Sequence, residues 1–100
     1  MNSMDNMKKL GKLDQAGNDA WKKFQAFNES AMAEGAVPVK YKELIALGVA
    51  LTTQCGYCLE IHREKAIDAG ATEAELAETT MVAAAIRAGG ALTHGTHLME

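Results

Sequence analysis

The sequence has few aromatic residues, a single proline and few runs of the β-branched residues that favour strands. Phe, Trp and Tyr together make up 5% of the 100 residues, whereas eighteen residues are alanine. Alanine is the best helix former and strands are rich in β-branched and aromatic side chains, so we expect an all-α chain without a parallel sheet. The apolar surface is built from small side chains, which suits close packing of helices.

An excess of positive charge and a long apolar run are also missing. Ten Lys and Arg stand against thirteen Asp and Glu, and the net charge of −3 argues against the broad basic surface of nucleic-acid-binding proteins. The longest apolar run, residues 44–51, is far shorter than the ~20 residues that span a bilayer, and no signal-peptide core follows Met1. We therefore expect a cytoplasmic protein that binds neither nucleic acid nor membrane.

The chain is short enough for a single domain covering residues 1–100, with residues 1–6 as a loose polar arm. Thr72 followed by Glu75 is a capping box, which marks the start of the last helix, and the apolar helix around residues 44–51 should be central and buried. Gly89 and Gly90 are expected either to kink or to end the last helix. Capping, proline and glycine signals predict helices at about residues 18–35, 38–51, 55–70 and from 72 onward, which makes a small helical bundle.

Two cysteines are present, Cys55 and Cys58, and two residues separate them. In a reducing compartment such a pair is seldom a structural staple, and a bridge over two residues would constrain almost no chain. On the first turn of a helix the two sulfurs are near enough to join, while the helix dipole and the free N–H groups lower the thiol pKa. The pair therefore predicts a redox-active dithiol.

Two further side chains stand at spacings that connect them to the dithiol. His62 comes four residues after Cys58, so both point from one helix face and the imidazole can exchange a proton with that sulfur. Glu43 shares a face with apolar positions 47 and 50, and a buried carboxylate needs a partner, for which His62 is the natural candidate. Glu43, His62 and Cys58 then form a proton relay if the chain turns back between Glu43 and Cys55. Glu43 taken alone could instead be a solvated carboxylate in the first turn of its helix.

These four residues resemble the active-site signature of the alkylhydroperoxidase D family, within the carboxymuconolactone decarboxylase superfamily. Eleven residues separate Glu43 from Cys55, two separate Cys55 from Cys58, and three separate Cys58 from His62. The wider likeness covers about residues 36–86. Four chemical positions at fixed spacings over twenty residues make a specific match.

The resemblance implies an all-helical fold that forms trimers or hexamers, and a peroxidase or disulfide reductase activity that needs no metal; no other cofactor is expected. By position, Cys58 would attack the substrate hydroperoxide or disulfide, Cys55 would be the resolving thiol, and His62 with Glu43 would transfer the proton. An external dithiol or a redox partner protein would reset the enzyme. Some members carry a histidine between the cysteines, where this chain has Tyr57. The small-residue stripe at 83–91 also points to a homo-oligomer.

Other interpretations stay open. A zinc site would combine the cysteines with His94 and His97, although these histidines lie in a glycine-broken tail and Glu43 would be unexplained. The chain could instead be a decarboxylase-like enzyme acting on a lactone acid, with incidental cysteines, or a structural oligomeric module. Arg87 is expected in a surface or inter-subunit ion pair, and otherwise at a substrate anion.

Overall fold

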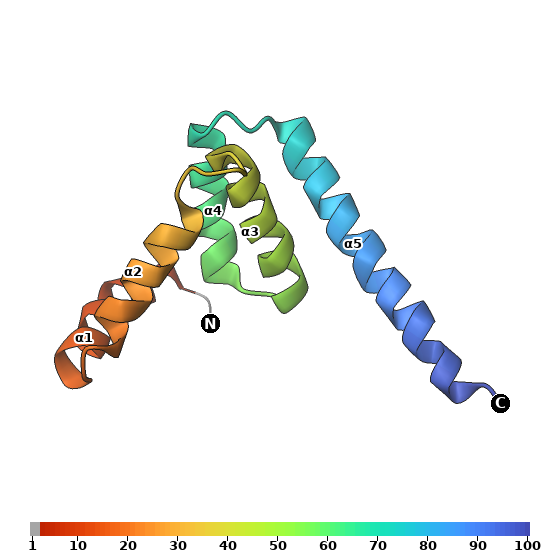
Figure 1. The fold of residues 1–100 in the computed structure, drawn as a ribbon, viewed down its shortest axis with the longest axis horizontal. Coiled ribbons are helices and arrows are strands. Elements are labelled where there is room, and N and C mark those ends of the chain that lie inside the picture. Colours follow the sequence, from red (N-terminus) through yellow and green to blue (C-terminus); the bar gives the residue numbers. More distant parts are fainter. Residues whose placement is uncertain (1–2) are drawn as a thin grey trace. The chain divides into compact units, whose positions relative to one another are not determined.

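The computed structural model describes residues 3–100, and the regular secondary structure of this part of the chain is helical throughout (Figure 1). The all-α prediction is confirmed. The chain divides into two compact units, residues 1–39 and 40–100, and each is described by itself. That residues 1–100 act as one domain stays a prediction.

The first unit contains three short helices. Ser3 begins a 3-10 helix, because its hydroxyl accepts a hydrogen bond from the Asp5 N–H at 3.3 Å. The polar character of residues 1–6 predicts a loose arm, but residues 4–6 belong to this helix. Residues 1 and 2 lie outside the described part of the chain. Asn18 Oδ1 accepts from the Ala20 N–H at 2.9 Å at the start of the third helix. The three helices are a 3-10 helix at Met4–Lys9, α1 at Leu10–Ala16 and α2 at Ala20–Met32.

α2 ends three residues before Gly35, the predicted end of that helix. Ala33 is already extended, at φ −70° and ψ 153°. The carboxylate of Glu34 then accepts a hydrogen bond from the Val39 N–H at 3.0 Å, so this side chain caps the following helix. We expect Pro38 in the first turn of that helix, where its missing N–H costs nothing. It stands one residue before the helix, which begins at Val39.

The second unit carries the remaining helices, and Figure 1 shows α3 and α4 side by side and α5 diverging from them. Leu47 of α3 and Ala66 of α4 are buried against each other together with Ala71. Leu44, Leu59 and Leu76 pack against this small core. The helices are α3 at Val39–Thr53, α4 at Gly56–Asp68, α5 at Glu73–Gly95 and a 3-10 helix at Thr96–Leu98.

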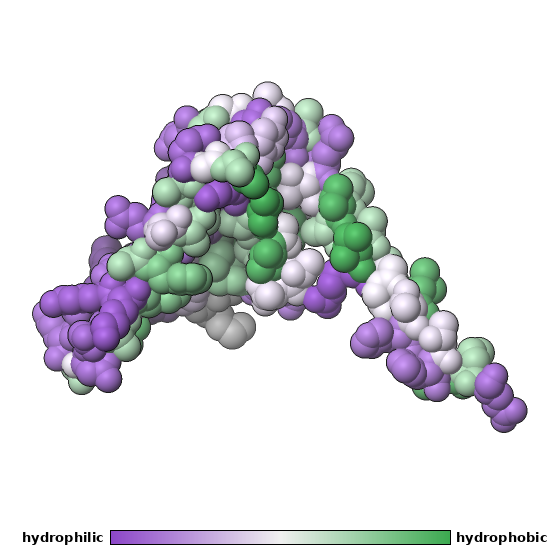
Figure 2. Space-filling view, in the orientation of Figure 1, coloured by the Kyte–Doolittle hydropathy of each residue, from purple (hydrophilic) through white to green (hydrophobic). Residues whose placement is uncertain are grey.

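α3 is covered on one face only, which corrects the prediction that this apolar helix is buried all round. Leu47 and Ala50 are buried, but Ile45 and Val49 remain 58% and 57% exposed. The physical reason is the course of α5, which leaves a groove of about 730 Å³ lined by apolar side chains of α3 and α5. Figure 2 shows hydrophobic atoms on both helices along this groove.

α4 and α5 end and begin as the sequence predicts. Gly70 follows α4 with φ +98°, a left-handed conformation that glycine adopts without steric cost. The Thr72 hydroxyl accepts from the Glu75 N–H at 3.1 Å and the Glu75 carboxylate accepts from the Thr72 N–H at 2.9 Å, which completes the capping box. α5 then continues past Gly89 and Gly90 to Gly95, so neither glycine ends it.

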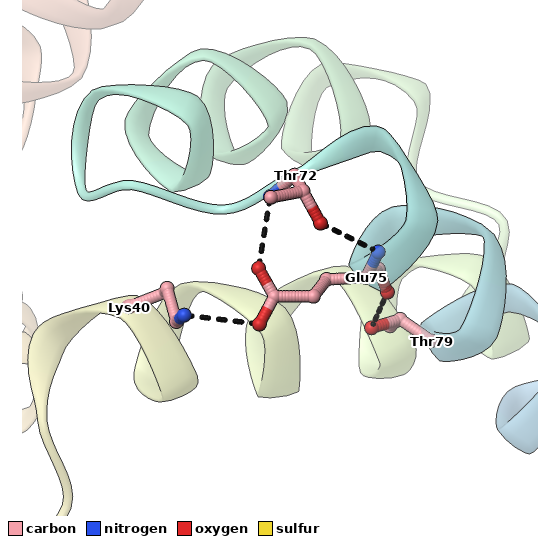
Figure 3. A network of polar contacts seen from close by, with 4 residues as sticks. All are labelled: Lys40, Thr72, Glu75 and Thr79. Atoms are coloured by element: carbon pink, nitrogen blue, oxygen red, sulfur yellow. Dashed lines mark hydrogen bonds and ion pairs between the residues drawn. The ribbon is translucent and has the colours of Figure 1, made fainter.

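The capping box also joins α5 to α3 (Figure 3). Lys40 Nζ lies 2.9 Å from a carboxylate oxygen of Glu75, and the Thr79 hydroxyl donates to the Glu75 carbonyl at 2.8 Å. The Thr72 N–H and then the Lys40 ammonium lower the pKa of the Glu75 carboxyl, and Glu75 in turn raises the pKa of Lys40. The start of α5 is thereby held against α3. Across residues 3–100, none of the helices combines the length and the apolar character needed to traverse a bilayer.

Candidate active site

The turn between α3 and α4 places the two cysteines. Gln54 has φ +57°, which is uncommon for a residue with a Cβ, and the Cys55 N–H donates to the Ala50 carbonyl at 3.1 Å. This combination is a Schellman motif, which ends a helix through one left-handed residue. Cys55 then serves as the N-cap of α4, with extended backbone at φ −89° and ψ 97°. One short turn therefore reverses the chain and leaves Cys55 at the N-terminus of a helix.

Cys55 and Cys58 lie together as free thiols. Their Sγ atoms are 2.6 Å apart, both side chains are half-buried, and the Cys58 N–H donates to Cys55 Sγ at 3.4 Å. The prediction that the spacing brings the sulfurs within reach of each other is confirmed. Backbone N–H groups at the helix start and a neighbouring thiol thus surround the Cys55 sulfur.

The surroundings of the two thiols shift their pKa values in opposite directions. Hydrogen bonds from the Cys58 thiol, the Cys58 N–H and the Tyr57 N–H lower the pKa of Cys55, against a smaller opposing effect of burial. The same interaction with Cys55, together with burial and the charge on Cys55, raises the pKa of Cys58 to about 11. In the reduced protein the first negative charge therefore resides on Cys55, with Cys58 as a protonated donor.

Glu43 and His62 form a pair between α3 and α4 in which Glu43 is buried and His62 is half-buried. His62 Nδ1 lies 2.6 Å from Glu43 Oε1, and Glu43 is only 4% exposed. The predicted reversal of the chain brings these side chains together from α3 and α4, across nineteen residues of sequence. Glu43 is thus the buried partner of the histidine and not a solvated first-turn carboxylate.

The pairing decides which ring nitrogen of His62 can take up a proton. An ionised carboxylate can only accept hydrogen bonds, so Nδ1 carries the hydrogen and donates it to Glu43. In the neutral ring Nε2 then holds the free lone pair. His62 follows Cys58 by four residues on α4, which places both on one face of the helix. The ring is therefore oriented and polarised as a general base would be.

The other histidines and Arg87 lie elsewhere. His94 and His97 are near the C-terminal end of the chain, with ring centroids 5.9 Å apart in an edge-to-face arrangement. Among residues 3–100, no three His, Cys, Asp or Glu side chains come together as ligands of one metal ion would, so the donor set of the zinc interpretation is not assembled within the chain. Arg87 donates a hydrogen bond to the Thr52 carbonyl at the end of α3, and its expected inter-subunit ion pair stays a prediction.

Sequence reasoning missed two features of the turn that carries the dithiol. The left-handed conformation of Gln54 has no signal in its residue type, since glycine is the usual choice at that position. The contact between Arg87 and α3 spans thirty-five residues and lies beyond any local pattern. The sequence signals that found the other site residues were spacings within a helix or across one turn.

Comparison with known proteins gives a family match that covers these residues. The family model described as the carboxymuconolactone decarboxylase family matches residues 18–100, which includes all four site residues. The chain belongs to the carboxymuconolactone decarboxylase family. The resemblance noted from the four spaced residues is thereby confirmed at the level of this family.

Several relatives of this family member are known by sequence. It is 40% identical over 85 residues to uncharacterized protein 4 in the cox locus of Paracoccus denitrificans, covering 85% of this chain and 77% of that protein. It is 35% identical over 75 residues to an uncharacterized protein of Cupriavidus necator, covering 75% of this chain and 66% of the relative.

Solved structures show the same fold. A protein from Methanobacterium thermoautotrophicum is 34% identical with a TM-score of 0.79, over 91% of this chain and 98% of the other. The apo form of a carboxymuconolactone decarboxylase family protein from Legionella pneumophila is 28% identical with a TM-score of 0.79, over 95% and 85% of the two chains. The all-helical fold of this family is therefore shared.

Proposed function

We propose that this protein is a thiol-dependent peroxidase, in the wider class of disulfide oxidoreductases, which uses the Cys55–Cys58 dithiol to reduce hydroperoxides. The observation that carries the proposal is the adjacency of the two sulfurs, 2.6 Å apart, at a helix N-terminus. The Glu43–His62 pair between α3 and α4 supports it, because a half-buried imidazole that is oriented by a buried carboxylate suits proton transfer. Family membership is compatible with an enzyme of this kind.

In the first step Cys58 attacks the hydroperoxide. Its proton passes to His62 Nε2, and an electron pair of the resulting thiolate attacks the distal oxygen of the peroxide. The S–O bond forms, the O–O bond breaks, and the alkoxide leaves and takes the proton from His62 as an alcohol. Sulfur is oxidised to a sulfenic acid and the peroxide is reduced by two electrons. The raised pKa of Cys58 explains why this step needs a base.

In the second step Cys55 resolves the sulfenic acid. Its thiolate attacks the Cys58 sulfur, the S–S bond forms, and hydroxide leaves to become water with a proton from solvent. The lowered pKa of Cys55 supports this role, because it increases the fraction of the resolving sulfur that is present as thiolate. An external dithiol then reduces the disulfide to two thiols and is itself oxidised to a disulfide. Cys55, with the lower pKa, is the better leaving group, so the incoming thiol should attack Cys58.

Reversible cycling of the dithiol tests this function. Exposure of the reduced protein to one equivalent of an organic hydroperoxide should remove two hydrogens, and a peptide map should locate a disulfide between Cys55 and Cys58. Addition of a dithiol reductant should restore the original mass, and repeated additions should consume peroxide catalytically. Turnover of a lactone acid that survives alkylation of both thiols would instead support a decarboxylase. A protein whose mass does not respond to peroxide or to a substrate disulfide would contradict the proposal.

We further propose that the protein works as a homo-oligomer, a trimer or a hexamer. Ile86 and Leu92 of α5 are 70% and 77% exposed, and the α3–α5 groove leaves apolar side chains of both helices uncovered. A second copy is the occupant whose own apolar α5 face matches this surface. Light scattering should give a mass three or six times 10.7 kDa, and Ile86→Glu should dissociate it. A single 10.7 kDa species for the unaltered chain would contradict this prediction.

A further inference from the structure

A hydrogen bond from the Arg87 side chain of α5 connects the end of α3 to α5, and we call this contact the tie. Arg87 Nη1 donates a hydrogen bond to the Thr52 carbonyl at 2.6 Å, across thirty-five residues of sequence. Thr52 stands three residues before Cys55, in the last turn of α3. The tie therefore reaches the turn that carries the dithiol.

The Thr52 carbonyl has no hydrogen-bond donor within its own helix. The last four carbonyls of an α-helix lack partners within the helix, and a positive charge there is favoured by the helix dipole. The Ala50 carbonyl is satisfied by the Cys55 N–H, at 3.1 Å. The hydroxyls of Thr52 and Thr53 both donate to Val49, at 2.9 and 3.0 Å, and so do not reach the Thr52 carbonyl. The Arg87 guanidinium supplies both the donor and the charge.

The same turn contains a strained backbone conformation at Gln54. Gln54 has φ +57°, which costs free energy for a residue with a Cβ, so the turn persists only where the surrounding contacts hold it. The Arg87 hydrogen bond lies two residues before Gln54 and the Cys55 N–H bond lies one residue after it. These two contacts hold the turn from both sides.

We propose that Arg87 is a positioning residue for the dithiol: by holding the last turn of α3, it keeps Cys55 at the N-cap of α4. The inference rests on the proposed function, in which this dithiol is the reactive site. Cys55 Sγ accepts the Cys58 N–H at 3.4 Å and lies 2.6 Å from Cys58 Sγ only while the turn keeps its conformation. Loss of the tie therefore leaves the Cys55 thiolate with fewer donors and makes it less reactive at neutral pH.

The test measures the alkylation of Cys55 by iodoacetamide against pH, located by peptide mapping, in the reduced full-length protein. Arg87→Ala should slow alkylation at pH 7 about fivefold and move the profile to higher pH, because the thiolate fraction falls. Arg87→Lys keeps the charge and one donor and should restore most of the rate. Lys65→Ala is the matched control, since it removes a cation from the last turn of α4 and leaves the α3 end untouched.

A wild-type profile in Arg87→Ala, or an equal slowing in Lys65→Ala, would overturn the proposal. If Arg87→Ala does not fold by circular dichroism, Arg87→Met decides, because it keeps the length of the side chain and removes the charge and the donors: about a fivefold slowing supports the proposal, and an unchanged profile overturns it. Alkylation needs only reduced thiols. A slowed Arg87→Ala in a protein that consumes neither peroxide nor disulfide would therefore refute the proposed function and leave the role of Arg87 standing.

Discussion

Replacement of Cys58 by serine is expected to abolish peroxide turnover, with a loss of about three orders of magnitude or more. The proposed attacking atom is the Cys58 sulfur, and a serine hydroxyl neither ionises near neutral pH nor accepts oxygen from a peroxide. The rate of hydroperoxide consumption in the presence of a dithiol reductant measures the effect. Retention of the original rate in Cys58→Ser would remove the peroxidase assignment.

Cys55→Ser is the matched control, because it removes the resolving thiol and leaves the attacking one. Its multiple turnover should fail while a single equivalent of peroxide is still consumed, leaving a sulfenic acid on Cys58 that a dione reagent can trap. Cys55 is the first cause of the raised pKa of Cys58, so this variant should also lower that pKa from about 11. A sulfenic acid trapped on Cys55 in the Cys58→Ser variant would contradict the proposed order, since it would make Cys55 the attacker.

His62→Ala is expected to lower the turnover rate about 10²- to 10⁴-fold at neutral pH, the usual contribution of a general base. The pKa of Cys58 is about 11, so at pH 7 about one molecule in ten thousand carries the Cys58 thiolate without help. With His62 absent, the rate should rise about tenfold for each pH unit until Cys58 ionises by itself near pH 11. The pH dependence of single-turnover peroxide consumption measures this slope.

Glu43→Gln tests how much the negative charge of Glu43 contributes, because it keeps the imidazole of His62 and the hydrogen bond that orients it. The amide has nearly the shape of the carboxylate and can still accept from His62 Nδ1, but it carries no charge to stabilise the protonated ring. The rate at pH 7 should therefore fall by about tenfold, less than in His62→Ala. A steep pH slope in the unaltered protein, equal to that of His62→Ala, would show that neither residue transfers the proton.

The helices could be predicted because their signals are local. The capping box of Thr72 and Glu75 and the left-handed Gly70 act within a few residues, and both stand where the sequence places them. The start of the chain and the end of α2 differ because Ser3 and Glu34 supply side-chain caps that no run of apolar residues announces. The exposure of Ile45 and Val49 depends on the course of α5 and could not be read from their apolar character.

By itself, the sequence determined an all-helical protein with a dithiol at the start of a helix and a histidine one turn beyond it, because these features depend on spacings of three and four residues. It also pointed to Glu43 as the partner of His62. Only the tertiary structure decided that the two side chains meet and that Arg87 reaches the turn before Cys55. The opposite pKa shifts of the two thiols come mainly from contacts among residues 55–58, and the structure supplied the positions of those atoms. The reason is physical: a hydrogen bond depends on the atoms that surround a group, and here α3, α4 and α5 bring those atoms together from distant parts of the chain.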